Sequence, residues 1–84
     1  MMRFTVVWRE IALGSLAELW STSPNRRSVN EAVEAIDRLL RDDPDRQGDD
    51  FYGDRVLVIS SIAFTFSVHE EDRTVEIIDL FSKE

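Results

Sequence analysis

Apolar residues fall at every second position through much of the last third of the chain. In residues 62–68 large apolar side chains alternate with small or polar ones, and a period of two places the large ones on one face of a β-strand. The alternation resumes after a polar turn at 69–72, and a shorter apolar run occupies 56–59. The residues in step beyond the turn are Val75, Ile77 and Phe81. Three strands with such short connections indicate an antiparallel meander.

The first half of the chain changes from strand-like to helix-like spacing. Residues 2–8 alternate as a strand does, and apolar residues then recur at helical spacing as far as the polar segment 21–25, which contains a proline. Ser28 and Glu31 have the spacing of a capping box, which predicts that a second helix opens at Ser28. An apolar stripe follows and stops at Asp42-Asp43-Pro44. The short connection between the two predicted helices indicates that they form an antiparallel helical hairpin.

In chain order the elements are one strand, two helices and three strands, which define an α+β fold. We expect a single domain over residues 1–84, with a four-stranded antiparallel sheet and the helical hairpin packed on one face. Residues 45–54 are expected to form a polar loop. The predicted core residues are Val6, Leu16, Trp20, Val33, Ile36, Leu40, Phe64, Phe66 and Ile77.

The composition narrows the classes of function. Ten Lys and Arg against seventeen Asp and Glu give a net charge of −7, which argues against direct nucleic-acid binding because polyanions are attracted to basic surfaces. The absence of cysteine and the single histidine, His69, argue against a metal site. No apolar run approaches the about 20 residues that cross a bilayer. We therefore expect a cytoplasmic protein with no metal, cofactor or membrane partner.

Arginines and aromatic residues near polar ends of the sheet are the candidate site residues. Arg55 opens the first strand of the meander and is a candidate to contact a phosphate or a partner's carboxylate. Arg9 and Arg73 become catalytic candidates with it if the sheet brings the three together. The predicted partner-binding residues are Phe51, Tyr52, Arg55 and Phe81.

This order of elements, with these residues, resembles the RelE/ParE toxin superfamily of type II toxin–antitoxin systems. The first strand running into Trp8, followed by Ala12 and Leu16, is similar to the opening of that family. The further matches are Ile36, Leu39-Leu40, Asp43-Pro44 and Gly48, and then residues 55–58, 62–68, 70–73 and 75–78. The resemblance covers nearly the whole chain.

The resemblance implies one of two activities. Some members cleave messenger RNA in the ribosomal decoding site, others poison DNA gyrase without cleavage, and in both a cognate antitoxin wraps the toxin. Ribonuclease members carry Arg and Lys on the concave face of the sheet, whereas this sequence has Ala63, Thr65 and Ser67 where an arginine is often found. Its last strand ends in Leu80-Phe81-Ser82, without arginine, histidine or tyrosine. These departures argue against ribonuclease activity.

Three hypotheses for function remain open at the level of sequence. The first is a toxin-like component that acts through protein–protein contacts and is neutralised by a cognate antitoxin. The second is an active ribosome-dependent endoribonuclease, and the third is a non-toxic homo-oligomeric protein that keeps only the fold. A homodimer is a further hypothesis, because so small a domain buries little of its own surface. The acidic charge predicts an antitoxin with Lys and Arg in its wrapping segment.

Overall fold

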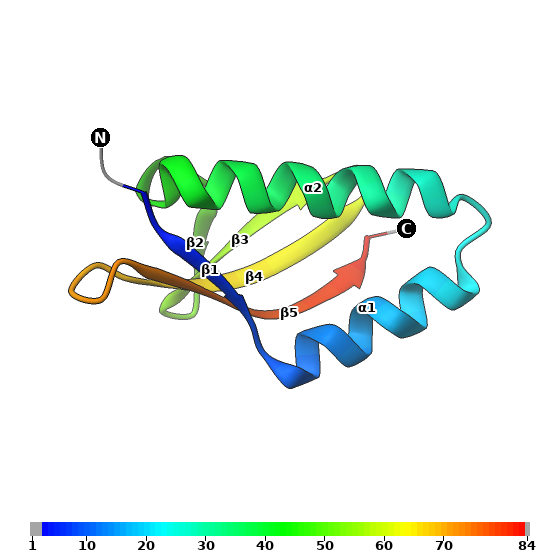
Figure 1. Cartoon of the computed structure of the whole chain (residues 1–84). Helices are drawn as coiled ribbons and strands as arrows, with labels where there is room; N and C mark the ends of the chain where they lie inside the picture. Colours follow the sequence, from blue (N-terminus) through cyan, green and yellow to red (C-terminus); the bar gives the residue numbers. More distant parts are fainter. Residues whose placement is uncertain (1–2, 84) are drawn as a thin grey trace.

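The computed structural model describes residues 3–83, which form two α-helices, a short 3₁₀-helix and a five-stranded sheet (Figure 1). The strand order across the sheet is β1-β5-β4-β3-β2. The elements are β1 (Thr5–Trp8), α1 (Glu10–Thr22), α2 (Arg26–Asp42), the 3₁₀-helix η1 (Pro44–Arg46), β2 (Asp49–Phe51), β3 (Asp54–Ile59), β4 (Ile62–His69) and β5 (Thr74–Ser82).

The sheet is mixed, so the expected α+β class is confirmed but the four-stranded antiparallel sheet is wrong. β1 runs parallel to β5, and the other neighbouring strands are antiparallel. The strand that the sequence did not predict is β2, which lies inside the segment 45–54 that is expected to be a loop. It folds back on β3 through Tyr52 and Gly53, whose φ angles of 51° and 91° are those of a tight two-residue hairpin turn.

The helices enclose one core with the sheet. α2 packs on β1, β3 and β4, and α1 lies along β5, in line with the end of β1 (Figure 1). The core joins Ala12 of α1 and Ile36 and Leu40 of α2 to Phe64 and Phe66 of β4. The aromatic ring of Trp8 meets that of Phe64 edge to face at 6.4 Å between centroids.

The N-cap of α2 lies three residues earlier than the capping box predicts. Asn25 is the N-cap, and its side-chain oxygen accepts a hydrogen bond from the backbone N–H of Ser28 at 3.1 Å. Ser28 therefore lies within the first turn of the helix rather than at its start. Asparagine is among the best N-cap residues, and the Ser-x-x-Glu spacing was coincidental here.

A β-bulge in β5 changes which of its residues face the core. Thr65 pairs with Asp79 and Phe66 pairs with Ile77, so Ile78 is an extra residue without a partner on β4. The alternation shifts by one position at this point. Leu80 is consequently buried and Phe81 is 44% exposed, and the prediction that Phe81 shares the face of Val75 and Ile77 is wrong.

The predicted core is confirmed at its centre and wrong at one position. Val6 and Leu16 are half-buried and pack against the core, and Val33 is half-buried. Trp20 is 39% exposed, because it lies at the edge of the groove between α1 and α2. The predicted residues that are fully buried are Ile36, Leu40, Phe64, Phe66 and Ile77.

Candidate functional site

The face of the sheet turned away from the core is the candidate site. Paired residues on neighbouring strands point to the same side, so the partners of Ala63, Thr65 and Ser67 all share the face opposite to Phe64 and Phe66. We call this surface the open face. Four strands contribute residues to it. From β1 and the residue after it come Thr5, Val7 and Arg9, and from β5 come Thr74, Glu76, Asp79 and Phe81. β4 contributes Ala63, Thr65, Ser67 and His69, and β3 contributes Val56 and Val58.

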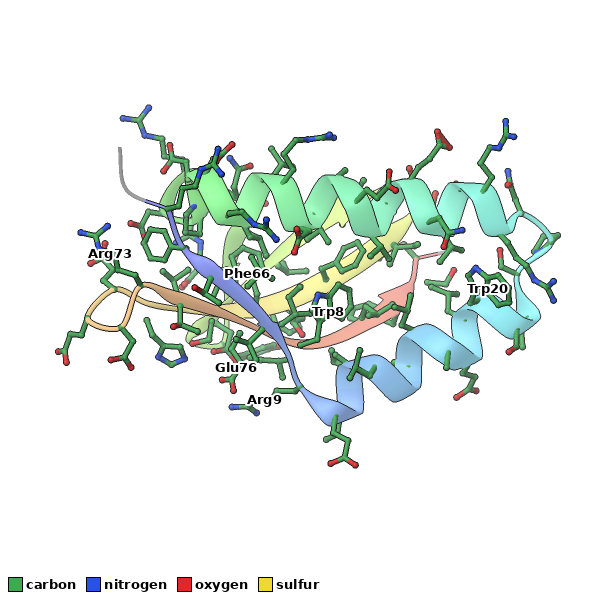
Figure 2. The ribbon with its side chains drawn as sticks, viewed as in Figure 1. Trp8, Arg9, Trp20, Phe66, Arg73 and Glu76 are labelled. Atoms are coloured by element: carbon green, nitrogen blue, oxygen red, sulfur yellow. The ribbon has the colours of Figure 1, made fainter. Side chains whose placement is uncertain are left out.

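One end of the open face carries a small charged cluster. Arg9 Nη2 donates to Glu76 Oε1 at 2.9 Å, and His69 Nε2 lies 3.6 Å from the same oxygen. The hydrogen bond from Arg9 lowers the pKa of Glu76, and Glu76 in turn raises the pKa of Arg9. Figure 2 shows Arg9 and Glu76 side by side below the sheet. The guanidinium of Arg9 is therefore already paired with a carboxylate.

The other end of the open face is apolar. Val58 pairs with Ala63, and Ala63 pairs with Phe81, which gives a row across three strands. Val58 is 50% exposed and Phe81 is 44% exposed. The small side chain of Ala63 is buried between these larger neighbours. An exposed apolar row of this kind suits contact with another protein.

Arg55 does not lie on the open face. It pairs with Phe66 and so points to the core side of the sheet. Its Nε donates to the carbonyl of Gln47 at 2.8 Å, and its Nη2 donates to the carbonyl of Gly48 at 3.2 Å. Gly48 has φ +75°, and a Cβ there would come within 2.6 Å of the carbonyl oxygen of Val56. Arg55 thus secures the tight backbone that leads into β2.

The three candidate arginines do not form a cluster. Arg73 lies at the β4–β5 turn with φ 53°, and its guanidinium is 5.9 Å from the ring centroid of Phe4. Arg9 is bound to Glu76 on the open face, and Arg55 binds backbone carbonyls on the opposite face. Figure 2 shows Arg73 and Arg9 in separate places. The arrangement does not bring three cations to one scissile phosphate.

The predicted aromatic residues are all exposed, but they lie in two places. Phe51 and Tyr52 meet edge to face at 5.0 Å in the β2–β3 turn, and Tyr52 is 96% exposed. Phe81 lies on the open face, in the row with Ala63 and Val58. The sequence suggested one patch, whereas the sheet places β3 and β4 between these residues. Their contact with a partner stays a prediction.

A second exposed apolar surface was not predicted. A groove of about 320 Å³ runs between α1 and α2, and its apolar lining is Leu13, Leu16, Ala17, Trp20 and Val33. The signal in the sequence was the breadth of the apolar stripe of α1, which extends beyond the residues needed to cover β5. Leu16, Trp20 and Val33 are among the predicted core residues, and the sequence predicts no role for Leu13 and Ala17.

Residues 3–83, the part of the chain that the structure describes, contain neither a metal-binding cluster nor a helix suited to span a membrane. No group of three His, Cys, Asp or Glu side chains there is arranged to hold a metal ion. Neither helix of this part of the chain combines the length and the apolar character needed to span a membrane.

Comparison with known proteins identifies the class of fold. A chain of the toxin–antitoxin complex RelBE2 from Mycobacterium tuberculosis superposes with a TM-score of 0.77 at 20% identity, covering 100% of this chain and 97% of that chain. A chain of the chromosomal ParDE TA system from P. aeruginosa superposes with a TM-score of 0.72 at 16% identity, covering 96% and 97%. No protein-family model and no curated protein matches the sequence.

The structure therefore has the same fold as these chains from two toxin–antitoxin complexes, as the resemblance in the sequence predicted. The likeness extends over the full length of the chain and includes the two helices and the mixed sheet. At these identities the superposition establishes the fold, and function has to be argued from the surfaces.

Proposed function

We propose that this protein is the toxin-like component of a type II toxin–antitoxin system, that it acts through protein–protein contacts, and that a cognate antitoxin neutralises it. The fold supports the first part of the proposal, because both similar structures come from toxin–antitoxin complexes. The chemistry of the open face supports the second part.

The observation that carries the proposal is that the guanidinium of Arg9 on the open face is already paired with a carboxylate. Cleaving RNA requires positive charge directed at the scissile phosphate as negative charge grows there. Within residues 3–83, Arg9 is the arginine that lies on this face, and its guanidinium is paired with Glu76 at 2.9 Å. Ser67 supplies a hydroxyl without charge, and the hydroxyl of the buried Thr65 already donates to the carbonyl of Asp79 at 3.2 Å. Such a face is poorly suited to stabilising a phosphorane-like transition state.

The apolar row on the open face supports a protein target or partner. Val58 and Phe81 expose about half of their side chains, although each lies in a well-paired strand. Leaving apolar side chains in water contributes nothing to folding, whereas a partner that covers them gains their burial.

Induced expression in a bacterial host tests this proposal. We expect the wild-type protein to arrest growth and the product of the adjacent reading frame to relieve the arrest. Val58→Asp should abolish the arrest, because it places a charge in the apolar row. Ile11→Asp is the matched control, since Ile11 is 67% exposed on α1 and is not part of the open face.

The outcomes separate the remaining hypotheses. Growth that continues with folded wild-type protein present would support the hypothesis of a non-toxic protein with this fold. Arrest that is lost in both Val58→Asp and Ile11→Asp would remove the open face from the proposal. Arrest accompanied by cleaved messenger RNA would favour the ribonuclease hypothesis.

A further inference from the structure

α1 has an apolar stripe that its own chain leaves partly uncovered. Its apolar residues are Leu13, Ala17 and Trp20, and the charged Glu10 precedes them by one turn. The four residues are spaced by three, four and three residues, which places them on one side of the helix. Leu13 is 51% exposed and Trp20 is 39% exposed. We call these four residues the α1 stripe. It borders the groove between α1 and α2.

The two ends of the α1 stripe carry opposite charges. Glu10 lies in the first turn of α1. At the other end, Arg26 Nε donates to the carbonyl of Trp20 at 3.2 Å, and its guanidinium lies 4.4 Å from the centroid of the Trp20 ring. Both contacts hold a positive charge beside the last turn of α1. Figure 2 shows Trp20 at the end of α1 that leads into α2.

This stripe is complementary to itself when it is reversed. If two α1 helices cross antiparallel about a two-fold axis that passes through the stripe midway between Leu13 and Ala17, Leu13 of one copy lies opposite Ala17 of the other, and a large residue meets a small one twice. The same axis places Glu10 of one copy opposite Trp20 of the other copy, and therefore close to the Arg26 that stacks on that Trp20 ring. Gly14 lies next to the stripe, and a Cβ there would have no atom within 4 Å, so a second helix can approach closely.

We propose that the α1 stripe is the interface of a homodimer in which the α1 helices of two copies pack antiparallel. Leu13 of each copy then enters the apolar groove of the other, and two Glu10–Arg26 ion pairs close the ends. A two-fold axis makes each contact occur twice, as an isologous interface requires. The proposal is independent of toxicity, so its outcome does not depend on the proposed function.

Sedimentation equilibrium of the purified full chain, from micromolar to near-millimolar concentration, tests the apolar part of the interface. We expect a concentration-dependent monomer–dimer equilibrium for the wild type. Leu13→Asp should weaken the dimer by about a hundredfold, because a carboxylate would be buried without a partner. Ile11→Asp should leave the dimer unchanged, since Ile11 is on the same helix, is exposed, and lies off the stripe.

Charge reversal tests the direction of packing and does not require a core substitution. Glu10→Arg alone and Arg26→Glu alone should each weaken the dimer by about tenfold, and the double variant should recover most of the loss, because the ion pairs re-form with their signs exchanged. Glu18→Arg and Arg27→Glu are the matched controls, since they make the same charge changes at exposed positions of the same two helices outside the stripe. Circular dichroism of each variant checks that it is folded.

Three results would overturn the proposal. One is a wild type that stays monomeric over the whole concentration range. Another is a dimer that Leu13→Asp and Ile11→Asp affect equally. The third is a double charge reversal that shows no recovery over the single variants, because the charged ends would then not meet across the interface.

Discussion

At the scale of single residues, the arginines show how a fold decides the use of a side chain. Arg9 follows β1 and Arg55 lies in β3. Arg9 is paired with Glu76 on the open face, whereas Arg55 donates to the carbonyls of Gln47 and Gly48 on the core side. The difference follows from strand register, since Arg55 pairs with the buried Phe66. An arginine that satisfies two backbone carbonyls has a structural role.

The pairing of Arg9 with Glu76 predicts a pH dependence of stability. Arg9 lowers the pKa of Glu76 below its ordinary 4.5, so the folded state favours the carboxylate. A depressed pKa contributes stability that is present above the unfolded-state pKa and is lost as the pH falls through the folded-state pKa. The free energy of unfolding of Glu76→Gln should therefore approach that of the wild type as the pH is lowered from neutral into the acidic range.

Chemical denaturation across this pH range, repeated in an Arg9→Ala background, measures the effect. In the Arg9→Ala background, the effect of Glu76→Gln on the free energy of unfolding should change much less with pH, because Arg9 is the main cause of the lowered pKa of Glu76. If the effect of Glu76→Gln on the free energy of unfolding changed equally with pH in the two backgrounds, the lowered pKa of Glu76 would have to come from a group other than Arg9.

At the scale of elements, the bulge in β5 determines which of two adjacent apolar residues stabilises the fold. Leu80 is 3% exposed and Phe81 is 44% exposed, because the extra residue Ile78 shifts the alternation. We expect Leu80→Ala to lower the free energy of unfolding by about 2–5 kcal/mol. Phe81→Ala should lower it by less than about 1 kcal/mol, as for other surface positions.

Urea denaturation of the two variants distinguishes the bulged strand from a regular one. A regular strand would keep Phe81 in step with Val75 and Ile77, and the larger loss would then belong to Phe81→Ala. That reversal of the two values would contradict the observed register.

The elements that the sequence predicted well are those with long periodic patterns. The alternation of 62–68 and the stripe of the second helix depend on many residues, so one exception does not change them. β2 was missed because Asp49–Phe51 is short and polar, and its pairing depends on the positive φ angles of Tyr52 and Gly53. The direction of β1 was missed because alternation carries no information about which neighbour a strand pairs with.

The candidate site was less predictable than the fold. The lack of a cation at Ala63, Thr65 and Ser67 was readable from the sequence, and these residues do lie on the open face. The separation of Phe51 and Tyr52 from Phe81, and the pairing of Arg9 with Glu76, depend on how distant strands are placed. Such contacts between residues far apart in the chain have no local signal.

At the scale of the whole molecule, the net charge of −7 predicts the chemistry of the proposed antitoxin. A wrapping segment rich in Lys and Arg would be attracted to this surface, and its association would slow as salt screens the attraction. Stopped-flow association with the product of the adjacent reading frame should therefore show an on-rate that falls with ionic strength. A partner with an acidic wrapping segment, or an on-rate that rises with salt, would contradict this.

The central claim is that the protein acts through protein contacts without cleaving RNA. Incubation of the purified protein with programmed, translating ribosomes, followed by mapping of messenger RNA ends, tests it most directly. We predict no new ends at the decoding site with wild-type protein that arrests growth in cells. Robust cleavage by the wild type that is lost in Arg9→Ala or His69→Ala would contradict the account, because it would show that the cluster around Glu76 is catalytic.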